Sequence, residues 1–156
     1  MRRKDRELTD PQKIREIIAK CDCCRLGLVA DGAAYIVPLN FAFVPDGDRG
    51  VFYFHSAGEG RKIQLLQRQK TITFEMDCGH RLKEGAVACR YGYAYQSVMG
   101  RGDAVFVEET AEKQQALALL MARYTERADW RFTEAETASV QIIKLTVSHW
   151  TAKQCV

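Results

Sequence analysis

The chain lacks any long hydrophobic run, because no stretch approaches the roughly 18 consecutive apolar residues that a membrane-spanning helix needs. It also lacks the start of a secretory leader, since the N-terminus is charged and no apolar signal core follows it. These two absences argue against a membrane partner and against export. We expect a cytoplasmic protein.

A large excess of one charge is also missing. The formal net charge is +3, and apart from Arg2-Arg3-Lys4 the basic residues are scattered along the chain. Proteins that bind nucleic acids usually gather lysine and arginine on one face. We therefore expect no nucleic-acid partner and a small anionic ligand instead.

Length and composition fit one globular unit. The chain has 156 residues, of which 47% are hydrophobic, and this is enough to build a single core. No internal repeat, low-complexity segment or linker interrupts it. The sequence predicts one domain over residues 1–156.

Six cysteines raise the question of a metal site. Residues 21–24, Cys-Asp-Cys-Cys, are dense in thiols, and residues 78–80 add a thiol and an imidazole. Structural zinc sites usually pair cysteines two to four residues apart, whereas Cys23 and Cys24 are adjacent. We therefore expect no metal, and reduced thiols with Cys24 and Cys89 packed as small apolar side chains. Whether the first cluster senses redox state stays open.

The most informative segment runs from Val51 to Lys62, with the sequence VFYFHSAGEGRK. A β-rich run ends in a loop of small residues, and Arg61 and Lys62 follow at the start of a predicted helix. The glycines let backbone N–H groups approach an anion, the helix start adds partial positive charge, and Ser56 offers a hydroxyl. The spacing matches neither a Walker A loop nor a dinucleotide fingerprint. A phosphate site is predicted, and a strand-to-helix turn with a solvated basic pair is the alternative.

The first half of the chain alternates helix and strand signals. A capping side chain before proline at residues 9–11 begins a predicted amphipathic helix that ends near residue 21. Asp31-Gly32 predicts a tight hairpin turn between two antiparallel strands. The pattern predicts strands over residues 25–30, 34–43 and 51–55, a helix over residues 61–68, and a further strand over residues 71–76.

The second half of the chain predicts a polar loop over residues 78–86 and two strands over residues 87–95 and 97–108. A helix over residues 110–125 and a last strand over residues 139–150 follow. Gly100 and Gly102 indicate bulges or close backbone approach. Leu117, Leu120 and Met121 have helical spacing and are expected in the core. About six antiparallel strands with helices at the edges predict an α+β domain built on a small barrel or a strongly curled sheet.

Four motifs cover most of the chain: CRLGLV at 24–29, YIVPLNF at 35–41, FHSA at 54–57 with GRK at 60–62, and YQSVMGRG at 95–102. Together they resemble the flavin-binding split-barrel proteins related to pyridoxamine 5′-phosphate oxidase, and among these the Nim-type group associated with 5-nitroimidazole resistance. The resemblance implies a predominantly antiparallel split β-barrel with flanking helices. It also implies FMN as the cofactor.

The resemblance implies that Arg61 and Lys62, together with Ser56, hold the FMN phosphate, which agrees with the anion site read from the residues. It further implies that the strand carrying the four residues Val37, Pro38, Leu39 and Asn40 runs beside the isoalloxazine ring. Pro38 has no N–H, so its strand needs an edge or a bulge, and an ordinary edge strand is the alternative. Ser97 lies where the oxidases place a glutamine that touches the ring.

His55 is the predicted catalytic residue, because it ends a strand beside the phosphate loop and, by resemblance, faces the cofactor. A histidine can donate a proton to a reduced nitro group or orient an oxyanion. A histidine hydrogen-bonded within the sheet is the alternative. Trp150 is expected to shield the flavin across a dimer interface, with simple packing as its alternative.

The resulting hypothesis is an FMN-dependent oxidoreductase of the Nim type that reduces nitroaromatic or other small electrophilic substrates, with NAD(P)H as a candidate electron donor. Residues 150–156 lack an R-x-H-type ending, which disfavours vitamin B6 oxidation. A homodimer is expected, with Phe41, Phe43 and Trp150 as candidates for the covered surface. The alternatives are a non-enzymatic flavin-binding or haem-handling protein and a protein that uses a deazaflavin.

Overall fold

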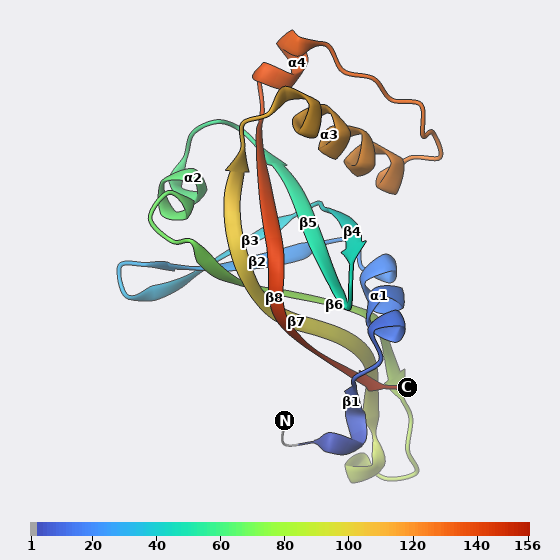
Figure 1. The fold of residues 1–156 in the computed structure, drawn as a ribbon. Helices are drawn as coiled ribbons and strands as arrows, with labels where there is room; N and C mark the ends of the chain where they lie inside the picture. The colour runs from blue at the N-terminus through green and yellow to red at the C-terminus, as the bar shows by residue number, and fades with distance from the viewer. Residues whose placement is uncertain (1–2) are drawn as a thin grey trace.

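The computed structural model describes residues 3–156, and its elements are shown in Figure 1. The strands are β1 (Glu7–Leu8), β2 (Cys24–Ala30), β3 (Ala33–Leu39), β4 (Ala42–Asp46), β5 (Arg49–Ser56), β6 (Thr71–Lys83), β7 (Gly92–Val107) and β8 (Gln141–Cys155). The helices are α1 (Pro11–Lys20), α2 (Arg61–Leu66), α3 (Thr110–Tyr124) and α4 (Glu134–Ala138), with 3₁₀ turns η1 (Lys4–Arg6) and η2 (Ala88–Arg90).

All pairings in the sheet are antiparallel, in the order β3-β2-β6-β7-β8-β5-β4, and β1 adds to β8. The two edge strands, β3 and β4, are separated in sequence by only Asn40 and Phe41. Leu39 and Ala42 therefore lie at most about 11 Å apart, and the sheet must curl until its edges approach. The edges do not pair, so the sheet is an open, split barrel. The predicted α+β split-barrel fold is confirmed.

Alternation along β5 decides which side chains enter the barrel. Phe52 and Phe54 are fully buried, whereas Tyr53 and His55 point to the other face. Phe52 contacts Phe43 and Phe74 with ring centroids 4.8 and 5.0 Å apart. Because side chains in a strand alternate between faces, the same residues that build the core direct His55 outward.

Two helices, α1 and α3, pack against the barrel and meet at their C-terminal ends. Helix α1 begins where Asp10 accepts a hydrogen bond from the Gln12 N–H at 2.9 Å, and Ile14 and Ile17 bury its apolar face. Helix α3 lies over the outer face of β5 and β8, where Leu117 belongs to a buried cluster with Ile142. Figure 1 shows α3 beside the upper parts of β5 and β8.

The tight turn between β2 and β3 is confirmed, with Asp31 at φ 54° and Gly32 at φ 78°. The single strand predicted over 34–43 is wrong. It ends at Leu39, since the Phe41 N–H donates to the Tyr124 hydroxyl at 3.0 Å instead of continuing the β3 ladder. A new strand, β4, begins at Ala42.

The polar loop predicted over 78–86 is also wrong, because β6 continues to Lys83. A register shift between Cys78 and Arg81, with Gly79 at φ 69°, absorbs the irregularity, and pairing with β7 then resumes. The strand predicted over 87–95 is wrong before residue 92, where the chain forms η2, and the rest joins the strand predicted over 97–108 as one strand, β7, in which Gln96 pairs normally. The predicted bulge is confirmed at Gly102, where the register with β8 shifts.

Cys24 is buried as expected, but Cys89 is exposed in η2, so its predicted packing role is wrong. Phe41 is also fully buried, which contradicts its expected place on a dimer surface. The sequence patterns missed α4, a helix of five residues. Within residues 3–156 no helix combines the length and the apolarity needed to cross a bilayer. The cytoplasmic location stays a prediction.

Candidate functional site

The predicted phosphate loop ends at Gly60, whose φ of 116° lies in a region that favours glycine. This residue is the N-cap of α2, so the chain turns at Gly60 and places Arg61 and Lys62 in the first turn of the helix. No atom would meet a Cβ at Gly58 or Gly60 within 4 Å. The backbone of the loop is therefore open to a ligand.

Arg61 connects the start of α2 to the β2–β3 hairpin. Its Nη2 lies 3.1 Å from the Asp31 carboxylate, and its guanidinium lies 5.1 Å from the centre of the Tyr35 ring. The side chains of Arg61 and Asp31 are 57% and 92% exposed. Exposed pairs of this kind stabilise a protein by about 0–1 kcal/mol, so an incoming phosphate can replace the carboxylate.

Lys62 is half-buried, and desolvation lowers the pKa of its ammonium below the usual 10.5. No carboxylate in residues 3–156 contributes an opposing shift. The folded chain thus holds a partly desolvated cation beside an open loop. An anion bound there would favour the charged form of the Lys62 ammonium, as expected of a lysine that contacts a phosphate.

The strand expected to run beside a flavin ring is an edge of the sheet. Val37 pairs with Leu26 and Pro38 with Arg25, and within the described part of the chain no strand pairs with the other side of β3. Pro38 was expected to need an edge strand or a bulge, and it lies in the edge strand β3. Leu39 ends this strand and Asn40 forms the corner that follows. Backbone groups along the free side of β3 are available to a ligand.

His55 and Asn40 meet at a hollow of about 320 Å³. The hollow lies between the end of β5, the corner after β3 and the last turns of α3. Its remaining lining is apolar or aromatic: Leu117, Leu120, Met121, Tyr124 and Phe132. The exposed side chain of His55 therefore borders a hollow whose walls are mostly apolar.

Tyr124 fixes the geometry of this hollow. Its hydroxyl accepts from the Phe41 N–H at 3.0 Å and donates to the Asp22 carbonyl at 2.9 Å. These bonds connect the C-terminal end of α3 to the corner at Asn40 and to the segment that precedes β2. The position of α3 over His55 is thus coupled to the path of the edge strands.

Ser56 lies on the opposite face of β5 from His55. It is buried and pairs with Gln141. The strand therefore presents the imidazole to the outer hollow and the hydroxyl to the inner face, directly before the loop that leads to Arg61. The structure brings the basic residues and the edge strand to one side of the barrel, and His55 and Asn40 to its outer hollow.

Ser97 and Trp150 lie elsewhere in the chain. Trp150 pairs with Gly100 and packs against Phe43, with ring centroids 6.2 Å apart. It lies nine residues further along β8 than Gln141, the partner of Ser56, which is roughly 30 Å of extended strand. Ser97 pairs with Lys153, still further along. Neither residue meets the phosphate loop within one copy of the chain.

The lining of the hollow was not predicted as functional. Leu117, Leu120 and Met121 were expected in the core, and the helical spacing that places them on one face was the only signal. Phe132 gave none. These residues come from α3 and the segment after it, more than 60 positions from His55, and only the fold brings them together.

The geometry can be set beside known proteins. The family model described as pyridoxamine 5′-phosphate oxidase matches residues 10–154. The chain belongs to the pyridoxamine 5′-phosphate oxidase family. A solved structure of a candidate 5-nitroimidazole antibiotic resistance protein from Bacteroides thetaiotaomicron is 32% identical, over 95% of this chain and 86% of that one, with a TM-score of 0.83. None of the curated proteins compared with the sequence matches it.

Two other solved members of this fold are more distant in sequence. A flavocytochrome from Azotobacter vinelandii has a TM-score of 0.82 at 19% identity, over all of this chain and 72% of that one. The FAD and heme binding protein from Mycobacterium smegmatis has a TM-score of 0.82 at 16% identity, over 96% and 73%. At these identities the two structures support the split-barrel fold alone.

Proposed function

We propose that the chain is an FMN-binding oxidoreductase of the Nim type that reduces nitroaromatic or other small electrophilic compounds. The observation that carries this proposal is the half-buried Lys62, which has no anionic partner among residues 3–156. It lies next to Arg61 at the open loop before α2. A phosphate is the group that best matches two adjacent cations and open backbone N–H groups.

The remaining residues fit the rest of FMN. The free side of β3 offers backbone groups from Val37 to Asn40, and these can bond the polar edge of a flat ring. In this arrangement Arg61 and Lys62 hold the phosphate. Bound FMN supplies the electron transfer itself, with NAD(P)H as the candidate donor. The chain supplies binding, orientation and shielding from water.

His55 is the group we assign to proton transfer. Its side chain is exposed and borders the hollow, which Asn40 also lines and whose other walls are apolar or aromatic. A nitro group that accepts electrons also needs protons on its oxygen atoms, and an imidazole can supply one. Leu117 and Phe132 restrict water around that transfer.

A second candidate function is flavin or haem handling without turnover. The two distant structures are named for haem-containing proteins, and an exposed histidine in an apolar hollow is also a suitable axial ligand for haem iron. The relative that is 32% identical is described as a 5-nitroimidazole resistance protein, which favours the reductase. In the haem reading, His55 binds iron and moves no proton.

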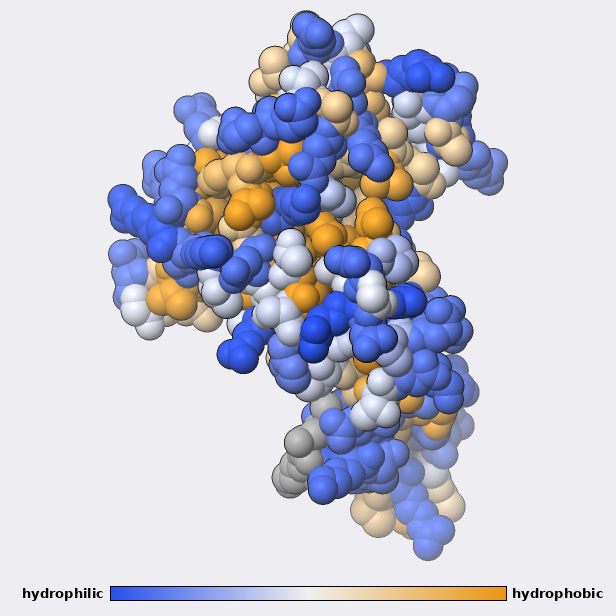
Figure 2. All heavy atoms as spheres, in the orientation of Figure 1, coloured by the Kyte–Doolittle hydropathy of each residue, from blue (hydrophilic) through white to orange (hydrophobic). Residues whose placement is uncertain are grey.

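A homodimer completes the proposal. Ser97 and Trp150 can reach a flavin only from a second copy, because each lies far along its strand from the loop of its own chain. Exposed side chains on the outer face of the sheet, Ile36 at 56% and Met99 at 58%, replace the buried Phe41 as candidates for the covered surface. Figure 2 shows hydrophobic residues gathered over the middle of one face of the sheet, ringed by hydrophilic ones.

The absorption spectrum of the purified protein tests this proposal. The account predicts a flavin spectrum, release of FMN on denaturation, bleaching by NAD(P)H without oxygen, and return of the colour when a 5-nitroimidazole is added. An intense haem band that moves when His55 is replaced would favour the second candidate. A deazaflavin spectrum would overturn the assignment of FMN.

A further inference from the structure

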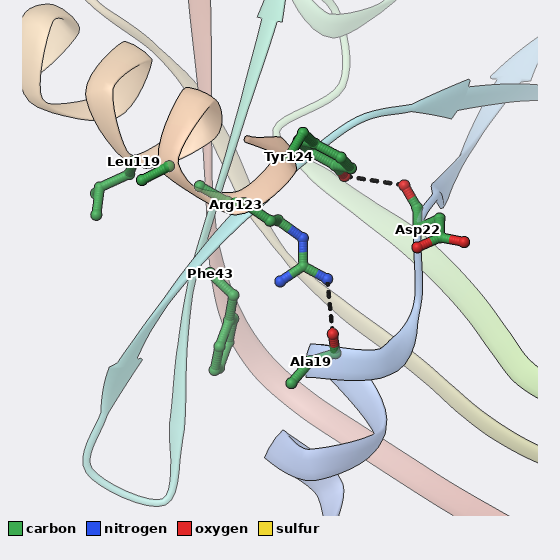
Figure 3. A pocket seen from close by; sticks show the side chains of 8 residues that line it. Ala19, Asp22, Phe43, Leu119, Arg123 and Tyr124 are labelled. Atoms are coloured by element: carbon green, nitrogen blue, oxygen red, sulfur yellow. Dashed lines mark hydrogen bonds between the residues drawn. The ribbon is translucent and has the colours of Figure 1, made fainter. Parts of the chain in front are cut away.

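A second hollow lies away from His55, between α1, β4 and the end of α3. Its volume is about 360 Å³, and its lining includes Arg15, Phe43, Pro45 and Arg123. It adjoins a hollow of about 380 Å³ that shares Phe43 and Arg123. Figure 3 shows this shared part, with the guanidinium of Arg123 between Phe43 and the last turn of α1.

Arg123 uses only part of its guanidinium. Its Nη2 donates to the carbonyls of Ile18 and Cys21 at 2.8 and 2.6 Å, which closes the C-terminal end of α1. The guanidinium stacks 4.0 Å from the centre of the buried Phe41 ring. Its Nε is buried and has no hydrogen-bond partner in the part of the chain that the structure describes.

Arg15 repeats this pattern from the opposite wall. Its Nη2 donates to the Gly47 carbonyl, and its Nε is likewise buried without a partner among residues 3–156. Neither arginine forms an ion pair within the described chain. Glu16 and Asp22 border the two hollows without bonding either guanidinium.

A buried charged donor without an acceptor is unfavourable. The Nη1 atoms of Arg15 and Arg123 are not among the buried unpartnered atoms, so they are the donors that a ligand in the hollow can reach. Both donors belong to guanidinium groups, whose planar fork matches a carboxylate. The nearby Phe43 ring and Pro45 offer an apolar surface on which a flat group can lie.

We propose that this hollow binds a small organic anion, a carboxylate attached to a flat apolar body. The carboxylate accepts hydrogen bonds from Arg15 and Arg123, and the apolar body lies against Phe43 and Pro45. The hollow lined by Arg15 shares no lining residue with the hollow of His55, and it includes neither β3 nor the loop before α2; only the adjoining hollow shares a residue, Tyr124, with the hollow of His55. Its ligand is therefore an additional one and does not depend on the proposed reductase activity.

Benzoate is a suitable probe, and benzamide is its uncharged control. In proton–nitrogen NMR spectra of the purified protein, benzoate should shift the Nε–H resonances of Arg15 and Arg123 in a saturable manner, and benzamide should not. The absorption spectrum of bound flavin should stay unchanged, which excludes binding beside the ring. Equal shifts with benzamide, or no saturable shift at either arginine, would overturn the proposal.

Matched variants locate the site. Arg15→Gln should weaken benzoate binding about tenfold or more, as expected for the loss of a charge-assisted pair. Lys13→Gln removes the same charge from an exposed position of α1 and should change the affinity less than about twofold. Arg15→Lys keeps the positive charge but lacks the planar guanidinium. It serves as the test variant if Arg15→Gln does not fold. Affinities equal to that of Lys13→Gln would contradict the site.

Discussion

The Tyr124 hydroxyl accepts a hydrogen bond from the Phe41 N–H at 3.0 Å, across 83 positions of sequence. It also donates to the Asp22 carbonyl at 2.9 Å. One side chain at the end of α3 therefore satisfies the backbone at the corner where the sheet passes from one edge strand to the other. This corner carries Asn40 and forms one wall of the hollow of His55.

Tyr124→Phe should destabilise the protein by about 1–3 kcal/mol, because it leaves the part-buried Phe41 N–H without an acceptor. For a domain of this size the melting temperature should fall by roughly 2–8 °C. Thermal unfolding followed by circular dichroism measures the change. Tyr91→Phe, which removes a hydroxyl from an exposed residue, is the control and should melt like the parent. Equal melting of the two variants would show that the bond contributes nothing.

His55→Ala should keep its bound FMN and its melting temperature while losing about 10²–10⁴-fold in turnover of a nitroaromatic substrate. The exposed position of the imidazole explains why stability should not change. His149→Ala, also exposed and on β8, is the matched control and should keep full activity. Loss of flavin or early melting in His55→Ala, with normal turnover by the remaining holo-protein, would make His55 a binding or packing residue.

Lys62 gives the site a pH dependence. Burial lowers the pKa of its ammonium below 10.5, and a bound phosphate prefers the charged form. FMN affinity should thus be full below the pKa of Lys62 in the free protein and fall as the pH rises through it. Lys62→Arg does not titrate in this range and should keep its affinity to higher pH. Parallel FMN titrations of the two proteins between pH 7 and 10 measure the difference, and identical profiles would remove Lys62 from the phosphate site.

Thiol reactivity should follow burial. Burial raises the pKa of the Cys24 thiol. The pKa of the buried Cys21 thiol is also raised, first by desolvation and then by the neighbouring Cys78. Cys89 is exposed. A coloured disulfide reagent at pH 8 should therefore modify Cys89 first, and Cys89→Ser should remove the fastest phase. A fast phase that persists in this variant and disappears in Cys24→Ser would contradict the assigned burial.

Local patterns predicted the elements that depend on neighbouring residues. The hairpin at Asp31-Gly32 and helix α1 follow from turn chemistry and capping, and both are present. The extension of β6 was missed because its exposed residues, including His80 and Arg81, are polar and resemble a loop. Pairing with β7 holds them in the strand. The break after Leu39 depends on Tyr124, which no local pattern can reveal.

The same distinction applies to the site. Arg61 and Lys62 lie in one contiguous motif, so their place at an open loop followed from the sequence. The walls of the hollow of His55 did not, because Leu117 and Phe132 approach it only after α3 has packed on the outer face of the sheet. The separation of Trp150 from the loop could not be predicted either, because it follows from the register of β8 with its neighbours.

The most direct measurement of the central claim is a fluorescence titration of the apo-protein with FMN and with riboflavin. The account predicts that FMN binds more tightly, since only FMN carries a phosphate. Replacing both Arg61 and Lys62 with alanine should weaken FMN binding by about 2–5 kcal/mol and leave riboflavin binding unchanged. Arg68→Ala with Lys70→Ala, two exposed cations just beyond α2, is the matched control and should bind FMN like the parent. Equal FMN affinity of the parent and the Arg61 and Lys62 double variant would contradict the phosphate site and, with it, the proposed cofactor.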